Sequence, residues 1–253
     1  MPAVKPLVYL VLGAAGSGRR EVLIDLIAGG LEPSDQPLVL LSDHEAADPA
    51  DKKLPNVQRW TWRDDALVTP ALGTANRVFL VTDGRTNPVD QVEAFKPWLE
   101  ANGAELARVI LVVHCQLAEQ TPALIAWYEA CVHFADVVLL NRREGVPNKW
   151  LSDFQGRFKD QFYPCLMEFV KAGRVKNPLL VLDPQARRMS HYFDEDIAWV
   201  SADGDDADES DADAPEGDEE VEMVPEEDPY LIRDAANRRK KIIPDIAKYL
   251  AGA

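Results

Sequence analysis

The stretch that decides the fold runs from residue 7 to residue 20 and reads L-V-Y-L-V-L-G-A-A-G-S-G-R-R. Its first six residues, Leu7–Leu12, are apolar and typical of a buried strand, and the residues after Arg20 carry apolar side chains at helical spacing. Glycines lie between the two at positions 13, 16 and 18. The order of strand, glycine-rich turn and helix is the context that a phosphate-binding loop requires, because the backbone N–H groups of the turn and the start of the helix both attract anions.

The turn has the G-x-x-x-x-G spacing of a Walker A motif, through Gly13 and Gly18. That motif continues with Lys and then Ser or Thr, whereas this chain has Arg19 and Arg20. Arg19 can neutralise a phosphate, although its planar guanidinium is bulkier than an ammonium group. Arg20 has no hydroxyl, so the usual protein ligand to Mg²⁺ is missing. The alternative is a tight turn that binds no nucleotide. The residues that we expect to hold phosphates are Gly13, Gly16, Ser17, Gly18, Arg19 and Arg20.

Short apolar runs recur along the chain and predict further strands. Besides the first, they span residues 37–42, 57–62, 77–82, 108–114, 135–140 and 178–182. Most are continuous rather than alternating, as in parallel strands that are buried on both faces. Helical patterns lie between several of them, over residues 19–28, 89–102, 122–133 and 147–162. The alternation predicts an α/β fold, with a mostly parallel sheet flanked by helices as in P-loop NTPases.

The charge pattern divides the chain into three parts. Of the 43 Asp and Glu residues, 15 lie in residues 203–228, and the other 28 are balanced by 27 Lys and Arg. We therefore expect a folded α/β domain over residues 1–200 and an acidic disordered linker over 201–228, because the linker has too few large apolar groups to fold. Residues 229–253 regain apolar spacing around a basic cluster, Arg238–Lys241. They predict a short C-terminal helix that docks on the body or on a protein partner.

Composition also excludes several classes of protein. The net charge of residues 1–202 is about −5, which does not favour nucleic acid as a partner. No apolar run reaches the roughly 18 residues of a membrane span. Three cysteines without a C-x-x-C pair, namely Cys115, Cys131 and Cys165, favour a reduced, cytoplasmic location. Lys5 followed by Leu7–Ala15 leaves one alternative open, since the pattern mimics a short signal peptide.

Two more polar motifs follow predicted strands. Asp83 and Gly84 come directly after one strand, at the place where P-loop proteins often hold a metal-bound water. A turn-forming Asp-Gly pair is the alternative. The strand over residues 135–140 ends in Asn141-Arg142-Arg143-Glu144, where guanine-reading GTPases have N-K-x-D. We expect Asn141 to help hold a base, Glu144 to accept hydrogen bonds from guanine N1 and N2, and the stem of Arg142 to cover the base face. A plain polar loop is the alternative here.

Taken together, the order of these motifs resembles the CobW family of P-loop GTPases and metallochaperones over about residues 1–165. Asn141 and the loop glycines match the family pattern. Three features depart from it: Arg19 and Arg20 replace Lys and Thr, N-R-R-E replaces N-K-x-D, and the C-x-C-C metal motif is absent, since residues 43–76 contain no cysteine.

The resemblance implies a protein that binds GTP or GDP and hydrolyses it weakly or not at all. If hydrolysis occurs, Asp83 is the catalytic candidate and positions Mg²⁺ through water. The alternative is a non-catalytic scaffold that keeps the fold and binds a protein partner through residues 229–250. His44 with Glu45, and His114 with Cys115, follow two strand ends and could be drawn as a zinc site. Their spacing is not diagnostic, so we predict no metal ligands among them.

Overall fold

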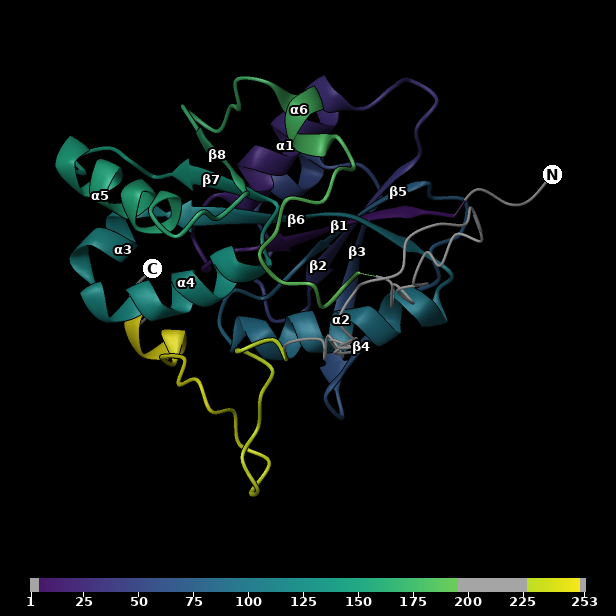
Figure 1. Ribbon diagram of the computed structural model, residues 1–253. Helices are drawn as coiled ribbons and strands as arrows, with labels where there is room; N and C mark the ends of the chain where they lie inside the picture. The colour runs from purple at the N-terminus through teal and green to yellow at the C-terminus, as the bar shows by residue number, and fades with distance from the viewer. Residues whose placement is uncertain (1–4, 195–226, 251–253) are drawn as a thin grey trace, which may run out of the picture.

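A mostly parallel sheet of eight strands runs through the middle of the molecule, as the sequence predicts (Figure 1). The computed structural model describes residues 5–194 and 227–250. The strands lie in the order β4-β3-β2-β5-β1-β6-β7-β8, and only β4 runs antiparallel to its neighbour. Their bounds are β1 (Leu7–Leu12), β2 (Pro37–Ser42), β3 (Val57–Arg63), β4 (Ala66–Val68), β5 (Arg77–Val81), β6 (Glu105–His114), β7 (Val137–Asn141) and β8 (Leu166–Phe169).

Strand β1 lies in the interior of the sheet, where its apolar side chains are buried on both faces. Successive side chains of a strand point to opposite faces. Tyr9 and Val11 enter the core on one face, and Val8, Leu10 and Leu12 enter the core on the other. All five are at most 2% exposed. The stretch that mimics the start of a signal peptide is therefore the central strand of this fold.

Helices cover both faces of the sheet. Figure 1 shows α1 and α6 on one face and α2 and α4 on the other, with α3 and α5 toward the β7 end. Within the described residues, the helix bounds are α1 (Arg19–Gly30), α2 (Pro88–Ala101), α3 (Cys115–Gln120), α4 (Ile125–Phe134), α5 (Asn148–Lys159) and α6 (Pro178–Leu182); short 3₁₀ helices are η1 (Pro49–Lys53), η2 (Pro122–Leu124) and η3 (Ile246–Tyr249). In the same parts of the chain, no helix is both long enough and apolar enough to span a membrane.

The predicted strand over residues 178–182 is wrong, because this run forms helix α6. A five-residue apolar run does not distinguish a strand from a helix by periodicity alone. The helix starts where Asn177 accepts a hydrogen bond from the Leu180 amide and Pro178 occupies the first turn. Helix α6 packs on α1, where β-carbons at Gly29 and Gly30 would lie 3.0 and 2.8 Å from its side chains. The glycine pair thus permits close contact between two helices.

Two strands of the sheet are not predicted from the sequence. Strand β8 forms the edge beyond β7, and β4 forms the other edge as an antiparallel partner of β3. Both are four residues or shorter and only partly buried. Their pairing comes from a neighbouring strand, which a local sequence pattern does not reveal.

The C-terminal segment docks on the body, on the side of the sheet covered by α2 and α4 (Figure 1, yellow). The predicted C-terminal helix is wrong for most of its length, since among the described residues of this segment only η3 is helical and the others form turns, a β-bridge and irregular structure. Tyr230, Ile246 and Leu250 are buried in the core, whereas Ile242 is 90% exposed. Except for its last two positions, the predicted linker over residues 201–228 lies outside the described residues.

Asp228 anchors the start of this segment. Its Oδ2 lies 2.8 Å from His133 Nε2 on α4 and accepts a 2.5 Å hydrogen bond from Ser190 Oγ, while its Oδ1 accepts one from the Tyr230 amide. Burial works against ionisation of this carboxyl, but the hydrogen bonds from His133 and Ser190 hold its pKa below the usual value. The carboxylate therefore joins α4, the segment after α6 and the C-terminal segment.

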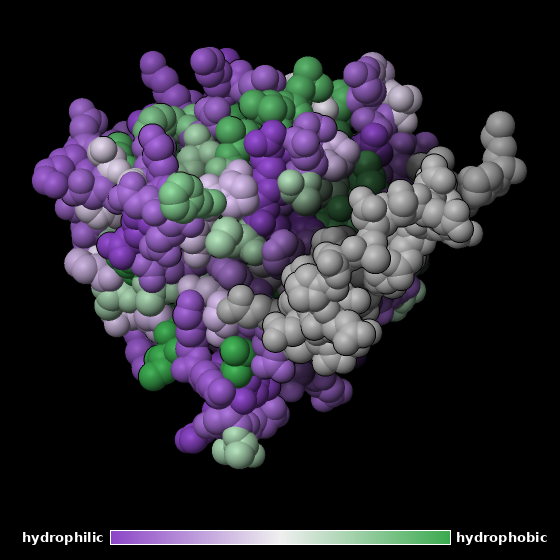
Figure 2. Space-filling model, viewed as in Figure 1, coloured by the Kyte–Doolittle hydropathy of each residue, from purple (hydrophilic) through white to green (hydrophobic). Residues whose placement is uncertain are grey.

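The surface on the viewed side is mostly hydrophilic (Figure 2). Hydrophobic residues gather near the top of that view, over α6, where Leu179 is 61% and Leu180 is 38% exposed. Single exposed apolar residues are normal on folded proteins, so they need no special explanation.

We predict that Asp228→Asn loosens the C-terminal segment. Hydrogen bonds to a charged group contribute about 1.5–3 kcal/mol, and the neutral amide does not replace them all. Hydrogen exchange should be faster over residues 229–250 and unchanged in β1. Asp234→Asn is the matched control, because Asp234 is a half-buried carboxylate of the same segment whose hydrogen bonds, among the described residues, stay within its own turn. Equal exchange in both variants would contradict the anchoring role.

The same contact should weaken in acid. Because the pKa of Asp228 is lower in the folded protein than in the unfolded chain, its contribution to stability is complete above the unfolded value of about 4. That contribution is lost as the pH falls through the folded pKa. Thermal melting of the parent protein and of Asp228→Asn should therefore converge below pH 4. A difference in melting temperature that does not shrink at all as the pH falls from 6 to the acid limit of folding would contradict this assignment.

Candidate functional site

The glycine-rich loop lies between β1 and α1, at the carboxyl edge of the sheet, as the sequence predicts. Gly13, Gly16 and Gly18 all have positive φ, at 142°, 79° and 86°. A β-carbon at Gly13 would lie 2.5 Å from the Val112 carbonyl oxygen, so only glycine fits between β1 and β6 there. Gly18 precedes helix α1, whose N-terminal N–H groups provide partial positive charge.

The loop after β5 packs directly against this turn. The Ala15 amide donates to the Gly84 carbonyl at 2.9 Å. A β-carbon on Gly84 would lie 2.4 Å from the Gly13 carbonyl oxygen and 2.6 Å from the Ala15 nitrogen. Gly84 has φ of 66°, a conformation that side chains rarely adopt. Gly84 is thus required for the close approach of the two loops.

Asn141 joins the first and third motifs, which are 124 residues apart in the sequence. Its Nδ2 donates to the Ser17 carbonyl at 2.8 Å, and a β-carbon on Gly18 would lie 2.4 Å from the same nitrogen. The parallel pairing of β1, β6 and β7 brings these strand ends to one edge. The structure therefore places the predicted base-holding residue against the predicted phosphate loop. Ser17 is buried, and its hydroxyl has no hydrogen-bond partner among the residues that the structure describes.

Arg19 does not point to solvent but folds back into the protein. Its guanidinium donates to the Thr82 carbonyl and, at 2.5 Å, to Glu45 Oε1, and its side chain is 4% exposed. Burial lowers the pKa of Arg19, an effect that the negative charges of Glu45 and Asp83 oppose. The charge that could neutralise a phosphate is thus already neutralised within the chain.

Glu45 and Asp51 are the residues of this site that sequence reasoning misses. Glu45 Oε2 lies 3.0 Å from Arg20 NH2, so the carboxylate bridges the two loop arginines. Asp51 pairs with Arg20 at 2.7 Å and with Arg59 at 2.9 Å. The signal in the sequence is the position of Glu45 after the strand over residues 37–42, at the same sheet edge as the loop.

The carboxylate of Asp83 accepts hydrogen bonds from residues of the turn that follows it. Its Oδ1 accepts hydrogen bonds from the amides of Arg85 and Thr86, and Thr86 Oγ1 reaches both oxygens at 3.1 Å. The side chain is nearly buried, since Asp83 is 5% exposed. This arrangement matches the turn-forming alternative, and a catalytic role for Asp83 stays a prediction.

Two small cavities adjoin each other at Glu21 and Arg142, which line both. One has a volume of 100 Å³ and is bounded by Gly16, Gly18, Arg19, Arg20, Glu21, Glu45, Asp48 and Arg142. The other has a volume of 130 Å³ and is bounded by Glu21, Asn141, Arg142, Glu144, Ala172 and Gly173. An ion pair of 3.0 Å between Arg142 and Glu21 borders both. Four of the six predicted phosphate residues and all three predicted base residues therefore line the two cavities, whereas Gly13 and Ser17 line neither.

The residues here do not fit Mg²⁺. Arg20 occupies the position of the usual hydroxyl ligand, the carboxylate of Glu45 is bound by two arginines, and that of Asp83 is bound by backbone amides. Mg²⁺ requires free carboxylate or hydroxyl oxygens and several waters. Throughout residues 5–194 and 227–250, no three His, Cys, Asp or Glu side chains gather into a group that could hold a metal ion.

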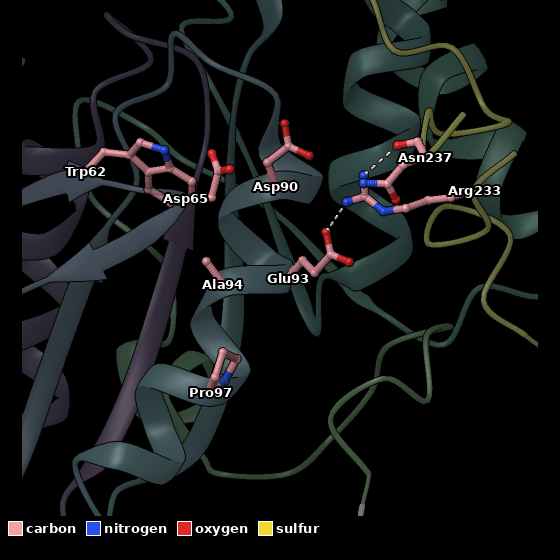
Figure 3. A pocket seen from close by; sticks show the side chains of 8 residues that line it. All are labelled: Trp62, Asp65, Asp90, Glu93, Ala94, Pro97, Arg233 and Asn237. Carbon is pink, nitrogen blue, oxygen red and sulfur yellow. Dashed lines mark hydrogen bonds and ion pairs between the residues drawn. The ribbon is translucent and has the colours of Figure 1, made fainter. Parts of the chain in front are cut away.

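A pocket of 510 Å³ lies elsewhere, between α2, the β3–β4 turn and the C-terminal segment (Figure 3). Its polar wall includes Asp65, Asp90 and Glu93. Arg233 pairs with Glu93 at 2.6 Å, as the dashed line in Figure 3 shows, and Arg239 pairs with both Asp90 and Glu93. These arginines come from the C-terminal segment, so the acidic wall is a docking contact within the chain.

Comparison with known proteins gives only distant likenesses. No protein-family profile matches the chain, and no curated protein matches it. Among solved structures, a zinc-bound triple mutant of YjiA GTPase matches with a TM-score of 0.43 and 15% identity, over 70% of this chain and 61% of that one. Zinc-bound YjiA GTPase from E. coli matches with a TM-score of 0.37 and 13% identity, over 72% and 66%. The chain thus spans less than two thirds of either protein's length.

We predict that Gly84→Ala disrupts the packing of the two loops. The left-handed backbone costs about 1–3 kcal/mol for a side chain, and overlap with backbone atoms of the neighbouring loop adds about 1–3 kcal/mol. Gly145→Ala is the matched control, because Gly145 has φ of 79° and open space around it. Urea denaturation should give a larger loss of stability for Gly84→Ala. Equal losses of stability in the two variants would mean that the close approach of Gly84 to Gly13 leaves room for a side chain.

Proposed function

We propose that this chain binds a guanine nucleotide at low affinity and hydrolyses it slowly or not at all. The observation that carries the proposal is the pair of adjoining cavities at the carboxyl edge of the sheet. Their order is the one that a nucleotide needs, with phosphates at the start of α1 and the base at the loop after β7. The hydrogen bond from Asn141 to Ser17 fixes the spacing between the two.

The ion pair between Arg142 and Glu21 is the part that must move for a nucleotide to enter. The two cavities hold 100 and 130 Å³, whereas pockets for small molecules hold roughly 300 Å³ or more. Both side chains are more than 40% exposed. Because an exposed ion pair contributes at most about 1 kcal/mol, a ligand can separate them at small cost. Opening joins the two spaces into one.

The base end favours guanine over adenine. Glu144 lies beside the 130 Å³ cavity, and its backbone carbonyl is held at 2.6 Å by Gln116 Nε2. A carboxylate is an acceptor only, and guanine offers two adjacent donors, N1–H and N2–H. Adenine presents no such pair on the same edge. The long stem of Arg142 is placed to cover the face of the base.

Slow hydrolysis follows from the side chains that surround the phosphate end. Phosphoryl transfer relies on a metal ion and on positioned charge that stabilises the transferred group. Here Arg20 replaces the metal-binding hydroxyl, and Glu45 already neutralises the arginine after Gly18. We therefore assign binding, rather than turnover, to this edge.

A second candidate is an interaction protein that binds a partner through its C-terminal segment. The observation that favours it is the exposure of Ile242, at 90%, next to the basic residues Lys240 and Lys241. Isolated exposed apolar residues are common, so this observation is weaker than the paired cavities.

We predict that GTP and GDP bind more tightly than ATP, and that Glu144→Ala weakens guanine nucleotides about 10- to 100-fold. That factor corresponds to about 1.4–2.8 kcal/mol in total, within the roughly 1–3 kcal/mol expected when two ligand donors lose a shared acceptor and become solvated again. Calorimetric titration measures it. Glu100→Ala is the control, because Glu100 is an exposed residue on α2.

Equal affinity for ATP and GTP in the parent protein would contradict the assignment of Asn141 and Glu144 to the base. Absence of binding by any of the three nucleotides at millimolar concentration would overturn the proposal and favour the interaction protein.

A further inference from the structure

Glu45 occupies the position where a bound anion would be expected. Its carboxylate contacts Arg19 NH2 at 2.5 Å and Arg20 NH2 at 3.0 Å, with 9% of its side chain exposed. Two guanidinium groups that converge on one carboxylate form the kind of charge-assisted contact that proteins use to bind phosphate. In this chain, the anion belongs to the protein itself.

The backbone around Glu45 is also held in place, by hydrogen bonds from Arg59. Arg59 NH1 donates to the Glu45 carbonyl at 3.1 Å and to the Ser42 carbonyl at 2.9 Å. Its NH2 group pairs with Asp51, which in turn pairs with Arg20. These contacts fix the backbone of Glu45 beside the glycine-rich loop. Its side chain therefore reaches Arg19 and Arg20 without a change in the backbone.

The phosphate-end cavity is consequently neutral before any ligand enters. Arg19, Arg20 and Arg142 contribute three positive charges, and Glu21, Glu45 and Asp48 contribute three negative charges. A ligand phosphate that enters this cavity therefore meets no net positive charge from the side chains that line it.

We propose that Glu45 acts as an internal anion in the place of a nucleotide's terminal phosphate, so that the site takes guanosine diphosphate without a divalent cation in preference to Mg–GTP. This inference rests on the proposed function, because it names the ligand of the same site. Diphosphate binding leaves the contacts of Glu45 with Arg19 and Arg20 intact. A triphosphate has to displace the buried carboxylate of Glu45 from the two arginines, and its terminal phosphate is then repelled by that negative charge.

The test is a calorimetric titration of GDP and GTP, each with Mg²⁺ and with EDTA, into the parent protein, Glu45→Gln and Asp48→Asn. The parent should bind GDP more tightly than GTP, with no need for Mg²⁺. Glu45→Gln removes one charge at almost constant shape, and it should raise the affinity for GTP about 10- to 100-fold and that for GDP much less. Asp48→Asn removes a charge from the same cavity, but its carboxylate caps its own turn. It should change both affinities by one similar factor.

Several results separate the failure of this inference from the failure of the proposed function. If the parent binds Mg–GTP more tightly than GDP, or if Glu45→Gln leaves the ratio of the two affinities unchanged, the internal anion is wrong and guanine binding stands. If no guanine nucleotide binds to the parent or to either variant, both fail. If Glu45→Gln does not fold, the ratio of the affinities for GDP and Mg–GTP in the parent protein decides alone.

Inorganic pyrophosphate provides a probe that is independent of the base. It should raise the melting temperature of Glu45→Gln by several degrees more than that of the parent, because a freed pair of arginines can bind it. Equal shifts in the two proteins would overturn the inference, whatever the base contributes.

Discussion

The ion pair between Arg19 and Glu45 is the contact on which this edge of the molecule depends. A buried guanidinium is tolerated only when it is paired and hydrogen-bonded, and here Glu45 and the Thr82 carbonyl meet that need. The three residues lie beyond the ends of β1, β2 and β5. One buried charge therefore ties together the glycine-rich loop, the segment after β2 and the loop after β5. The close approach of Gly84 to Gly13 is compatible with this arrangement.

The sequence predicted most of the fold because its main strands are continuous apolar runs with helical patterns between them. The central strand, Leu7–Leu12, and its glycine-rich turn were identified with their bounds. The prediction was wrong at 178–182, where a short apolar run is a helix that packs on Gly29 and Gly30, and it omitted the short edge strands. Such elements take their form from neighbours in space. A local pattern contains no information about those neighbours.

The candidate site was predicted in part. Asn141 lies against the glycine-rich loop because parallel strands bring their carboxyl ends to one edge of the sheet. The alternation of strand and helix patterns in the sequence predicts that parallel arrangement. Glu45 could not be assigned from the sequence, because its partners lie 25 and 26 residues away and many carboxylates were equally placed. Likewise, nothing local marks Asp228 as the anchor of the C-terminal segment. Pairings between distant charged groups are set by tertiary packing, so they appear only in the folded chain.

On our proposal, one edge of the sheet holds a guanosine diphosphate while Glu45 stays bound to the loop arginines. An NMR titration of the isotopically labelled protein with GDP, without metal, tests it most directly. The account predicts shifts of the backbone amides of Gly16, Gly18 and residues 141–145, with the side-chain carboxyl resonance of Glu45 and the amides of residues 229–250 unchanged. Shifts confined to α2 and the C-terminal segment, or a large change in the Glu45 carboxyl resonance on GDP binding, would contradict it.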